Sequence, residues 1–313
     1  MKTGDKMTKK AVTGNIFLLL AAALWGLAFV AQSDGMNYLG PFAFTSARSF
    51  LGSAAMIPVC IFTMGKKKKT LSEKEYGNTV RATVKTELIC GIVAFFAVGS
   101  QQIGLQYTSA GKSGFITAMY IVLVPVLGGI FLKNKTGASS WTGVILAVCG
   151  LYLLCVKEDF SVGKGDIFTL FCALVFAVQI LVIDRNSDKI DGALMNLIQF
   201  AVVSVVSAPF YFALEEPVTL ESLKGAWTAI VYTGVFSSGV AYLFQIIGQQ
   251  YSDNPPVASL IMSMESVFAG FFGWLILHEG MSARELSGVA LMLSAIVISQ
   301  IPVKHFGKKS QNL

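Results

Sequence analysis

Long apolar stretches alternate with short polar segments along almost the whole chain. Ten of these stretches have about 20 residues each, the length that an α-helix needs to cross the hydrocarbon core of a bilayer. The predicted membrane helices span residues 14–31, 42–64, 86–106, 112–132, 139–156, 165–184, 192–214, 226–249, 257–277 and 285–302. The pattern therefore predicts an all-α, polytopic membrane protein with ten transmembrane helices and no extramembrane domain.

The composition supports this class and excludes others. Of the 313 residues, 54% are hydrophobic and 13% are charged, whereas about 25% are charged in a typical soluble domain. The net charge of +6 lies in connectors and tails, so no basic stripe on a polar module predicts nucleic-acid binding. The five cysteines all lie in apolar stretches without a C-x-x-C motif. We expect them to be buried, and we expect no metal and no cofactor.

The positive charges predict an orientation in the membrane. If the N-terminus is cytoplasmic, 18 of the 24 Lys and Arg residues fall in the inner connectors and tails. By the positive-inside rule, this predicts a cell-membrane protein with cytoplasmic tails at residues 1–13 and 303–313. The run Lys66–Lys69 belongs to this signal and could also contact anionic lipid head groups.

The chain contains an internal repeat. Three segments recur in the same order, 144 to 151 residues later: GNIFLLLAAALWG from Gly14 as GDIFTLFCALVFA from Gly165, IGLQYTS from Ile103 as IGQQYSD from Ile247, and TGVILAVCG from Thr142 as SGVALMLSA from Ser287. This predicts two five-helix units, residues 14–156 and 165–302. Because five is odd, the second unit enters the membrane from the opposite face. Such inverted repeats are typical of secondary transporters, whose halves rock around a central site.

Several motifs also match a known family. They are Leu24-Trp25-Gly26, Arg48, YTSAGKSGFITAMYIVLVP at 107–125, PPVASLIMSMESVFAGFFGWLILHE at 255–279, and Gly288. With these motifs the sequence resembles the drug/metabolite transporter superfamily, in particular its EamA-like families with two five-helix repeats. The resemblance implies a transporter rather than an enzyme, and export of a small metabolite such as an amino acid. Two positions depart from it: Ser266 replaces an expected proline, and Asn134 takes the place that matches Glu279.

Glu265 is the strongest candidate for a functional side chain. It lies about 12 Å into its predicted helix, where an ionised carboxylate costs several kcal/mol. We predict that it recognises the substrate or couples transport to a proton, because burial favours its protonated form and a bound cation its ionised form. The alternative is a protonated carboxyl group that only links helices. At an offset of 144 its counterpart is Ile121, so the repeat does not explain the charge.

Arg48 is the second charged candidate. It lies about six residues from the outer end of its predicted helix, within reach of the head groups by snorkelling. Snorkelling or a structural bridge to backbone carbonyls is the favoured interpretation. The sharper hypothesis is capture of a substrate carboxylate through two hydrogen bonds.

Uncharged polar and aromatic residues complete the predicted substrate site. Gln101 and Gln245 correspond at the offset of 144, and they either line a cavity or hold helices together. Trp25, Tyr120 and Tyr242 could form an apolar wall for a ligand, although most intramembrane aromatic residues are simply packed. A homodimer is a further possibility, since residues 139–156 and 285–302 contain few polar residues and could face a second subunit.

The repeated I-G-x-Q-Y-[ST] segment suggests gates. Tyr107 and Tyr251 would flank the outer and inner mouths of the path in an inverted repeat. The alternative is that Gly104 and Gly248 merely allow close helix packing.

Parts of the sequence also match two other functional classes, an intramembrane protease and a non-transporting scaffold. Gly111-Lys112-Ser113-Gly114 matches the G-x-S-G motif of rhomboid intramembrane proteases, with Ser113 as nucleophile and His278 as base. A four-residue match in a glycine-rich chain is a weak signal. A non-transporting membrane scaffold would need no coherent polar path, and the repeat and Glu265 count against it.

Overall fold

The computed structural model describes residues 9–108, 110–133, 136–155, 162–186, 190–252, 254–277 and 282–300. Within these ranges the secondary structure is helical throughout. The elements are α1 (Lys9–Gly35), α2 (Pro41–Thr70), α3 (Glu73–Leu105), α4 (Ala110–Thr117), α5 (Tyr120–Leu132), α6 (Ala138–Cys155), α7 (Lys164–Asn186), α8 (Gly192–Leu214), α9 (Leu220–Val231), the π-helix η1 (Tyr232–Ala241), α10 (Tyr242–Tyr251), α11 (Pro255–Met262), α12 (Glu265–Leu277) and α13 (Ala283–Ser299).

The all-helical membrane architecture is confirmed. Among the described residues, eight helical segments are long and apolar enough to cross a membrane. Two of the ten predicted spans coincide with α6 and α13, which are shorter and are not among those eight. Helices suit this environment because each satisfies its own backbone hydrogen bonds where lipid offers none.

Two predicted helices are interrupted, where the sequence pattern predicted continuous ones. The segment from α4 to α5 breaks at Ala118–Met119, and that from α11 to α12 breaks at Ser263–Met264. At both breaks the backbone changes to i→i−3 hydrogen bonds, such as Ile121 N–H to the Ala118 carbonyl at 3.0 Å. The second break occurs although Ser266 replaces the expected proline. Short tight turns of this kind within a helix often mark functional hinges.

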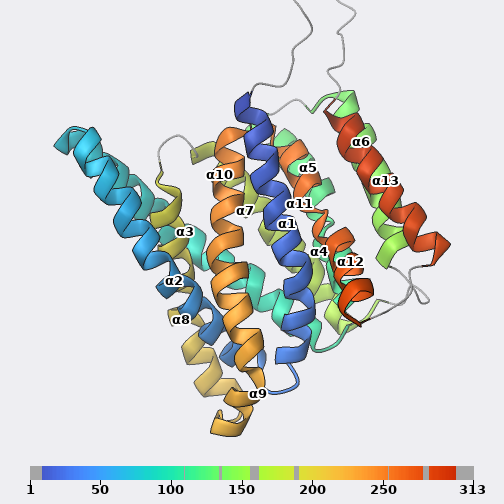
Figure 1. The fold of residues 1–313 in the computed structure, drawn as a ribbon, viewed down its shortest axis with the longest axis horizontal. Coiled ribbons are helices and arrows are strands. Elements are labelled where there is room, and N and C mark those ends of the chain that lie inside the picture. Colours follow the sequence, from blue (N-terminus) through green and yellow to red (C-terminus); the bar gives the residue numbers. More distant parts are fainter. Residues whose placement is uncertain are drawn as a thin grey trace, which may run out of the picture.

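The connector expected at residues 65–85 is helical instead. Only Leu71 and Ser72 separate α2 from α3, and a capping box between Ser72 and Glu75 starts α3. The two helices are about 45 and 50 Å long, so they exceed the roughly 30 Å hydrocarbon core. Their polar ends project from the body as a hairpin (Figure 1).

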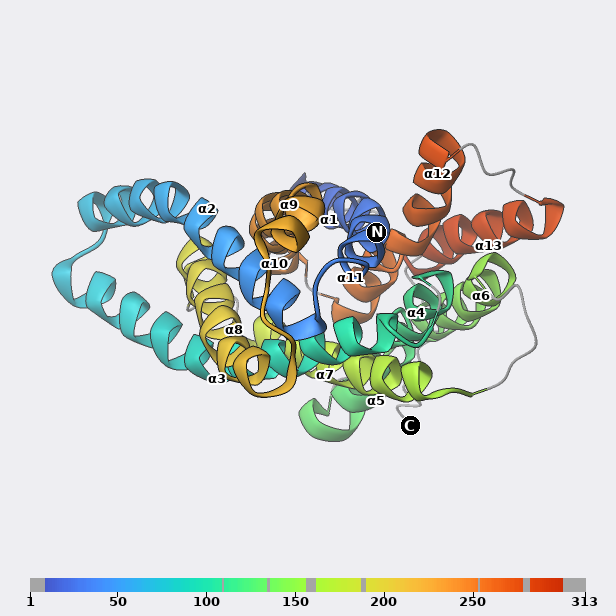
Figure 2. The same cartoon turned by 90° about the horizontal axis from the view of Figure 1, so that it is seen from below.

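The helices are arranged as a bundle with two distinct ends. Seen from below, α2, α3 and α8 lie at one end, and α6 and α13 lie at the other (Figure 2). Between them lie α1, α7, α10 and α11. Close backbone contact joins α6 to α13, because a Cβ atom on Gly150 would lie 2.8 Å from the carbonyl oxygen of Gly288.

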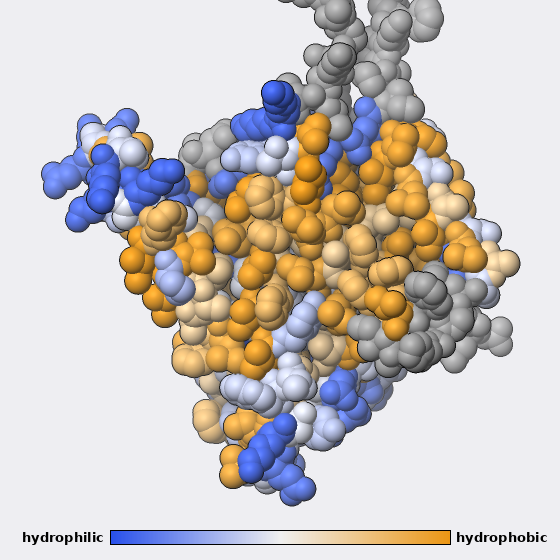
Figure 3. All heavy atoms as spheres, in the orientation of Figure 1, coloured by the Kyte–Doolittle hydropathy of each residue, from blue (hydrophilic) through white to orange (hydrophobic). Residues whose placement is uncertain are grey.

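The outer surface matches a lipid environment. Large apolar side chains cover the middle of the molecule, while charged residues gather at the tip of the α2–α3 hairpin (Figure 3). Phe62, Phe131 and Phe212 are more than 70% exposed. The expectation that the cysteines are buried holds for Cys60, Cys90 and Cys172 but is wrong for Cys149, which α6 turns outward. The side chain of Cys155 lies outside the described residues.

Candidate functional site

A cavity lies at the centre of the bundle. It encloses about 530 Å³ of space between protein atoms, part of it open to the outside. All six residues predicted for substrate binding or coupling line it: Trp25, Arg48, Gln101, Tyr120, Gln245 and Glu265. They come from α1, α2, α3, α5, α10 and α12. Both interrupted helices contribute residues from either side of the break: Thr117 and Tyr120 in one, Met262 and Glu265 in the other.

Glu265 and Tyr120 meet in the cavity wall. The Tyr120 hydroxyl donates a hydrogen bond to Glu265 Oε1 at 3.3 Å, and the two side chains are 4% and 5% exposed. Each is the first residue after a helix break, so the breaks correspond at an offset of 145 residues. At this offset the counterpart of Glu265 is Tyr120, whereas at the offset of 144 it is Ile121. The position of Glu265 at the start of α12 also exposes it to the favourable end of the helix dipole.

Arg48 is buried, so the snorkelling interpretation is wrong. Its side chain is 3% exposed, and neither Nε nor Nη2 has a hydrogen-bond partner. The guanidinium carbon lies 5.9 Å from the centre of the Phe44 ring. The two ion pairs among the described residues are Lys67–Asp191 and Lys112–Asp166, so Arg48 and Glu265 do not pair. Unused donors on a buried guanidinium are costly unless a ligand or water occupies them.

The amide side chains divide into two groups. Gln101 and Gln245 both line the cavity, and Gln101 Nε2 donates to Thr117 Oγ1 at 3.3 Å. Outside the cavity, Gln179 Nε2 donates to Gln199 Oε1 at 2.8 Å. That bond joins α7 to α8, as expected of polar residues that hold membrane helices together.

Aromatic rings form the apolar part of the wall. The Trp25 and Tyr242 rings meet edge to face at 5.0 Å, and Tyr242 meets Phe200 in the same way at 4.8 Å. Trp25 Nε1 is buried without a hydrogen-bond partner. Phe29 and Phe176 also line the cavity.

Sequence reasoning gave no lining role to three polar residues that line the cavity, Gln32, Thr117 and Ser237. Gln32 lies at the predicted end of the first helix, where a polar residue needs no explanation. Thr117 has a common side chain that usually bonds to its own helix. Only their position beside the other lining residues distinguishes them.

The proposed gates do not line the cavity. Tyr107 is 60% exposed at the end of α3, and Lys10 Nζ lies 5.5 Å from the centre of the Tyr251 ring. Their role as gates stays a prediction. The neighbouring glycines instead make the close contacts of the alternative interpretation. A Cβ atom on Gly104 would overlap with Thr169 Oγ1, and one on Gly248 would lie 2.6 Å from Leu18 Cγ.

We expect Gly104→Ala and Gly248→Ala each to lower the free energy of unfolding by about 1–3 kcal/mol, because the added methyl group overpacks a helix contact. Gly77→Ala is the matched control, since nothing lies within 4 Å of a Cβ atom there. Thermal unfolding of the purified variants measures the effect. Equal midpoints for the Gly104 and Gly77 variants would contradict the packing role.

The protease alternative gains no support from the described residues. Ser113 is 0% exposed, its Oγ has no hydrogen-bond partner, and it does not line the cavity. An activated serine needs a base within hydrogen-bond reach. The proposed base, His278, lies outside the described residues. No group of His, Cys, Asp and Glu within the described ranges could hold a metal ion.

Comparison with known proteins places the chain among transporters. It is 29% identical over 294 residues to an "Uncharacterized transporter" of Archaeoglobus fulgidus, covering 94% of this chain and 88% of that protein. It is 23% identical to "Uncharacterized transporter YoaV" of Bacillus subtilis, covering 90% and 94%. It is 26% identical to "WAT1-related protein At3g02690, chloroplastic" of Arabidopsis thaliana, covering 89% and 67%.

The fold also has a solved counterpart. A structure titled "Crystal structure of protein" superposes with a TM-score of 0.73 at 13% identity, covering 92% of this chain and 96% of that one. The sequence pattern of the EamA-like transporter family matches twice, over residues 12–156 and 163–300. With the two matches covering most of its length, the chain belongs to the EamA-like transporter family.

Proposed function

We propose that this chain is a secondary transporter that exports a small metabolite such as an amino acid. Transport would occur by alternating access, in which the central cavity opens to one side of the membrane and then to the other. One observation carries the proposal: the cavity holds a buried carboxyl group and a buried guanidinium that do not pair with each other. An amino acid carries the two complementary charges on groups that are attached to the same carbon atom. A single ligand of this kind compensates both groups.

Each lining group has a place in such a complex. The free Nε and Nη2 donors of Arg48 suit a carboxylate, which a guanidinium grips through two parallel hydrogen bonds. Glu265 suits the ammonium group. The rings of Trp25 and Tyr242 lie beside them and suit an apolar side chain.

Proton coupling follows from competition at Glu265. Its burial favours the protonated form, while a bound ammonium group or the start of α12 favours the ionised form. Proton and substrate amine therefore exclude each other at one carboxyl group. A carrier that must exchange one for the other moves them in opposite directions, which makes it a proton-driven exporter.

We further propose ten spans, arranged as two inverted units at residues 14–156 and 165–302, with α6 and α13 as the shorter spans. Two equivalent pairs of features support this arrangement. The start of α1 contacts the end of α10 through Gly14 and Gly248, as the start of α7 contacts the end of α3 through Gly165 and Gly104. The fourth helix of each unit breaks at the equivalent position, before Tyr120 and before Glu265. A two-fold pseudo-axis also suits a site at the midplane.

The orientation is part of the proposal. Lys66–Lys69 lie on the projecting polar hairpin, so the positive-inside rule places that end and both termini in the cytoplasm. Cysteine labelling at positions 68 and 223, in a background without the native cysteines, tests it. Reaction of both positions from the same side would contradict the arrangement.

The function is tested in proteoliposomes with an imposed pH gradient. Amino acids, sugars and organic cations are offered in turn, and accumulation is measured with and without the gradient. We expect gradient-driven accumulation of zwitterions. Transport of neutral sugars alone, or accumulation that ignores the gradient, would overturn the proposed recognition and coupling.

A further inference from the structure

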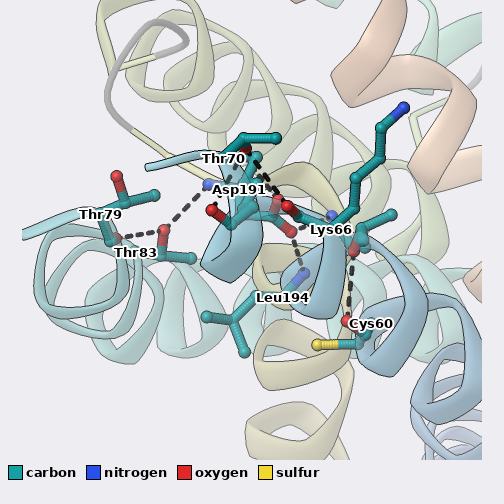
Figure 4. Close-up of polar contacts among 10 residues, drawn as sticks. Cys60, Lys66, Thr70, Thr79, Thr83, Asp191 and Leu194 are labelled. Atoms are coloured by element: carbon teal, nitrogen blue, oxygen red, sulfur yellow. Dashed lines mark hydrogen bonds and ion pairs between the residues drawn. The ribbon is translucent and has the colours of Figure 1, made fainter. Parts of the chain in front are cut away.

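A polar cluster joins α2, α3 and the start of α8 at the end of the bundle that carries Lys66–Lys69. Figure 4 shows Thr83 between Thr79 and Asp191. The Thr83 hydroxyl donates to the Thr79 carbonyl at 2.8 Å and accepts from the Asp191 N–H at 2.9 Å. Asp191 pairs with Lys67 at 2.6 Å and accepts from two backbone N–H groups at the start of α8. Its negative charge is fully compensated.

Glu87 lies one turn further along α3. In contrast to Asp191, it has no charged partner and no backbone donor nearby among the described residues. Its side chain is 0% exposed, and neither carboxyl oxygen has a hydrogen-bond partner. Its polar neighbour is the thiol of Cys90, about one turn along α3, which is only a weak hydrogen-bond donor. Among the described residues, the charged or titratable groups on the helices packed against this part of α3 include Lys67 and Cys60 on α2, Asp191 before α8, and Asp184 and Arg185 at the end of α7. On α3 itself, Arg81 and Lys85 precede Glu87. No ion pair joins Glu87 to any of them.

A carboxylate in such a place is strongly disfavoured, so Glu87 carries its proton in this form of the protein. Glu87 shares one stripe of α3 with Gly91, Ala94, Val98 and Gln101, and the last two line the cavity. Between Glu87 and the cavity, α3 and α8 pack closely together, because a Cβ atom on Gly91 would lie 2.7 Å from Val202 Cβ on α8. Glu87 thus lies on the hairpin side of a tight α3–α8 contact, and the cavity lies beyond it.

We propose that Glu87 is a second proton-binding site of this carrier, separate from Glu265, which holds its proton while the α3–α8 contact is closed and releases it to water when that contact opens. The site rests on the proposed function, because it needs a carrier in which this contact opens during the cycle. Opening hydrates the carboxyl group, which then ionises without an added partner. Protonation in turn favours the closed contact.

The first test is independent of transport. Dicyclohexylcarbodiimide is apolar and converts protonated carboxyl groups into stable acylureas, which peptide mass spectrometry locates. In the purified full-length protein we expect an adduct at Glu87 whose yield falls about tenfold for each pH unit above its midpoint. Glu75, exposed on the same helix, is the matched control and should stay nearly unlabelled. Equal labelling of Glu75 and Glu87 at every pH, or an unlabelled Glu87 at acidic pH, would overturn the site.

The second test links the site to the cycle. Glu87→Gln keeps the shape of the side chain but cannot ionise, so the closed contact is favoured at every pH. We expect substrate exchange without a gradient to become several-fold slower and to lose the part of its pH dependence that Glu87 contributes, while the competition between proton and substrate at Glu265 keeps the rest. Carbodiimide labelling at Glu265 should be the same in this variant and in the wild type. A wild-type pH profile in this variant would contradict the role in the cycle. Absence of transport in the wild type would instead refute the proposed function and leave the labelling result standing.

Discussion

Glu265→Gln is expected to abolish proton-driven accumulation of substrate while the protein still folds and inserts. Glutamine preserves the shape and can still accept the hydrogen bond that Tyr120 donates to Glu265 at 3.3 Å, but it neither takes up nor releases a proton. With the membrane potential held at zero, exchange of one proton supports about tenfold accumulation per pH unit, since one unit corresponds to about 1.4 kcal/mol. In the variant the ratio should fall to about one, with downhill exchange retained.

The measurement is radiolabelled substrate uptake in proteoliposomes at several imposed gradients. Glu73→Gln removes a carboxylate from the exposed start of α3 and serves as the charge-matched control. It should accumulate substrate as the wild type does. If Glu265→Gln keeps wild-type accumulation across the range, the carboxyl group is a structural link between helices and coupling lies elsewhere.

Arg48→Gln is expected to raise the KM for an amino-acid substrate by roughly 10- to 100-fold, because hydrogen bonds to charged groups contribute about 1.5–3 kcal/mol. Arg48→Lys should restore only part of the affinity, since an ammonium group lacks the planar fork that binds both carboxylate oxygens. The free Nε and Nη2 donors of the buried side chain are the structural basis.

A decarboxylated analogue of the substrate distinguishes loss of carboxylate binding from general damage to the fold in Arg48→Gln. It offers nothing for Arg48 to bind, so the wild type and Arg48→Gln should transport it with the same KM. Arg81→Gln, exposed on α3, is the control for loss of a positive charge. Equal losses for substrate and analogue would show that Arg48 supports the fold and does not bind the carboxylate.

The candidate site could be found from sequence largely because polar groups are expensive in lipid. A charged or amide side chain inside an apolar stretch persists only where it is compensated, so Glu265, Arg48, Gln101 and Gln245 stood out. All four line one cavity. The same reasoning failed for Glu87, because it follows the charged segment 66–85 and looks like the polar end of a helix.

The direction in which a side chain points was harder to predict from the sequence. Depth along the helix suggested that Arg48 could reach the head groups, yet it is 3% exposed in the interior. Cys149 lies in an apolar stretch and was expected to be buried, yet its side chain is exposed on the outer surface. A sequence position gives the depth of a residue in the membrane, but the direction of its side chain depends on which neighbouring helices pack against it.

The sequence by itself determined the features that depend on local physics. Runs of apolar residues form helices because lipid leaves the backbone no other hydrogen-bond partners, and short matching segments reveal the repeat. Only the tertiary structure decided where α4–α5 and α11–α12 break, which residues meet across the cavity, and that no charged group among the described residues pairs with Glu87. These features depend on contacts such as that between Tyr120 and Glu265, which are 145 residues apart. No local pattern encodes such a contact, because its energy arises only when the distant segments pack together.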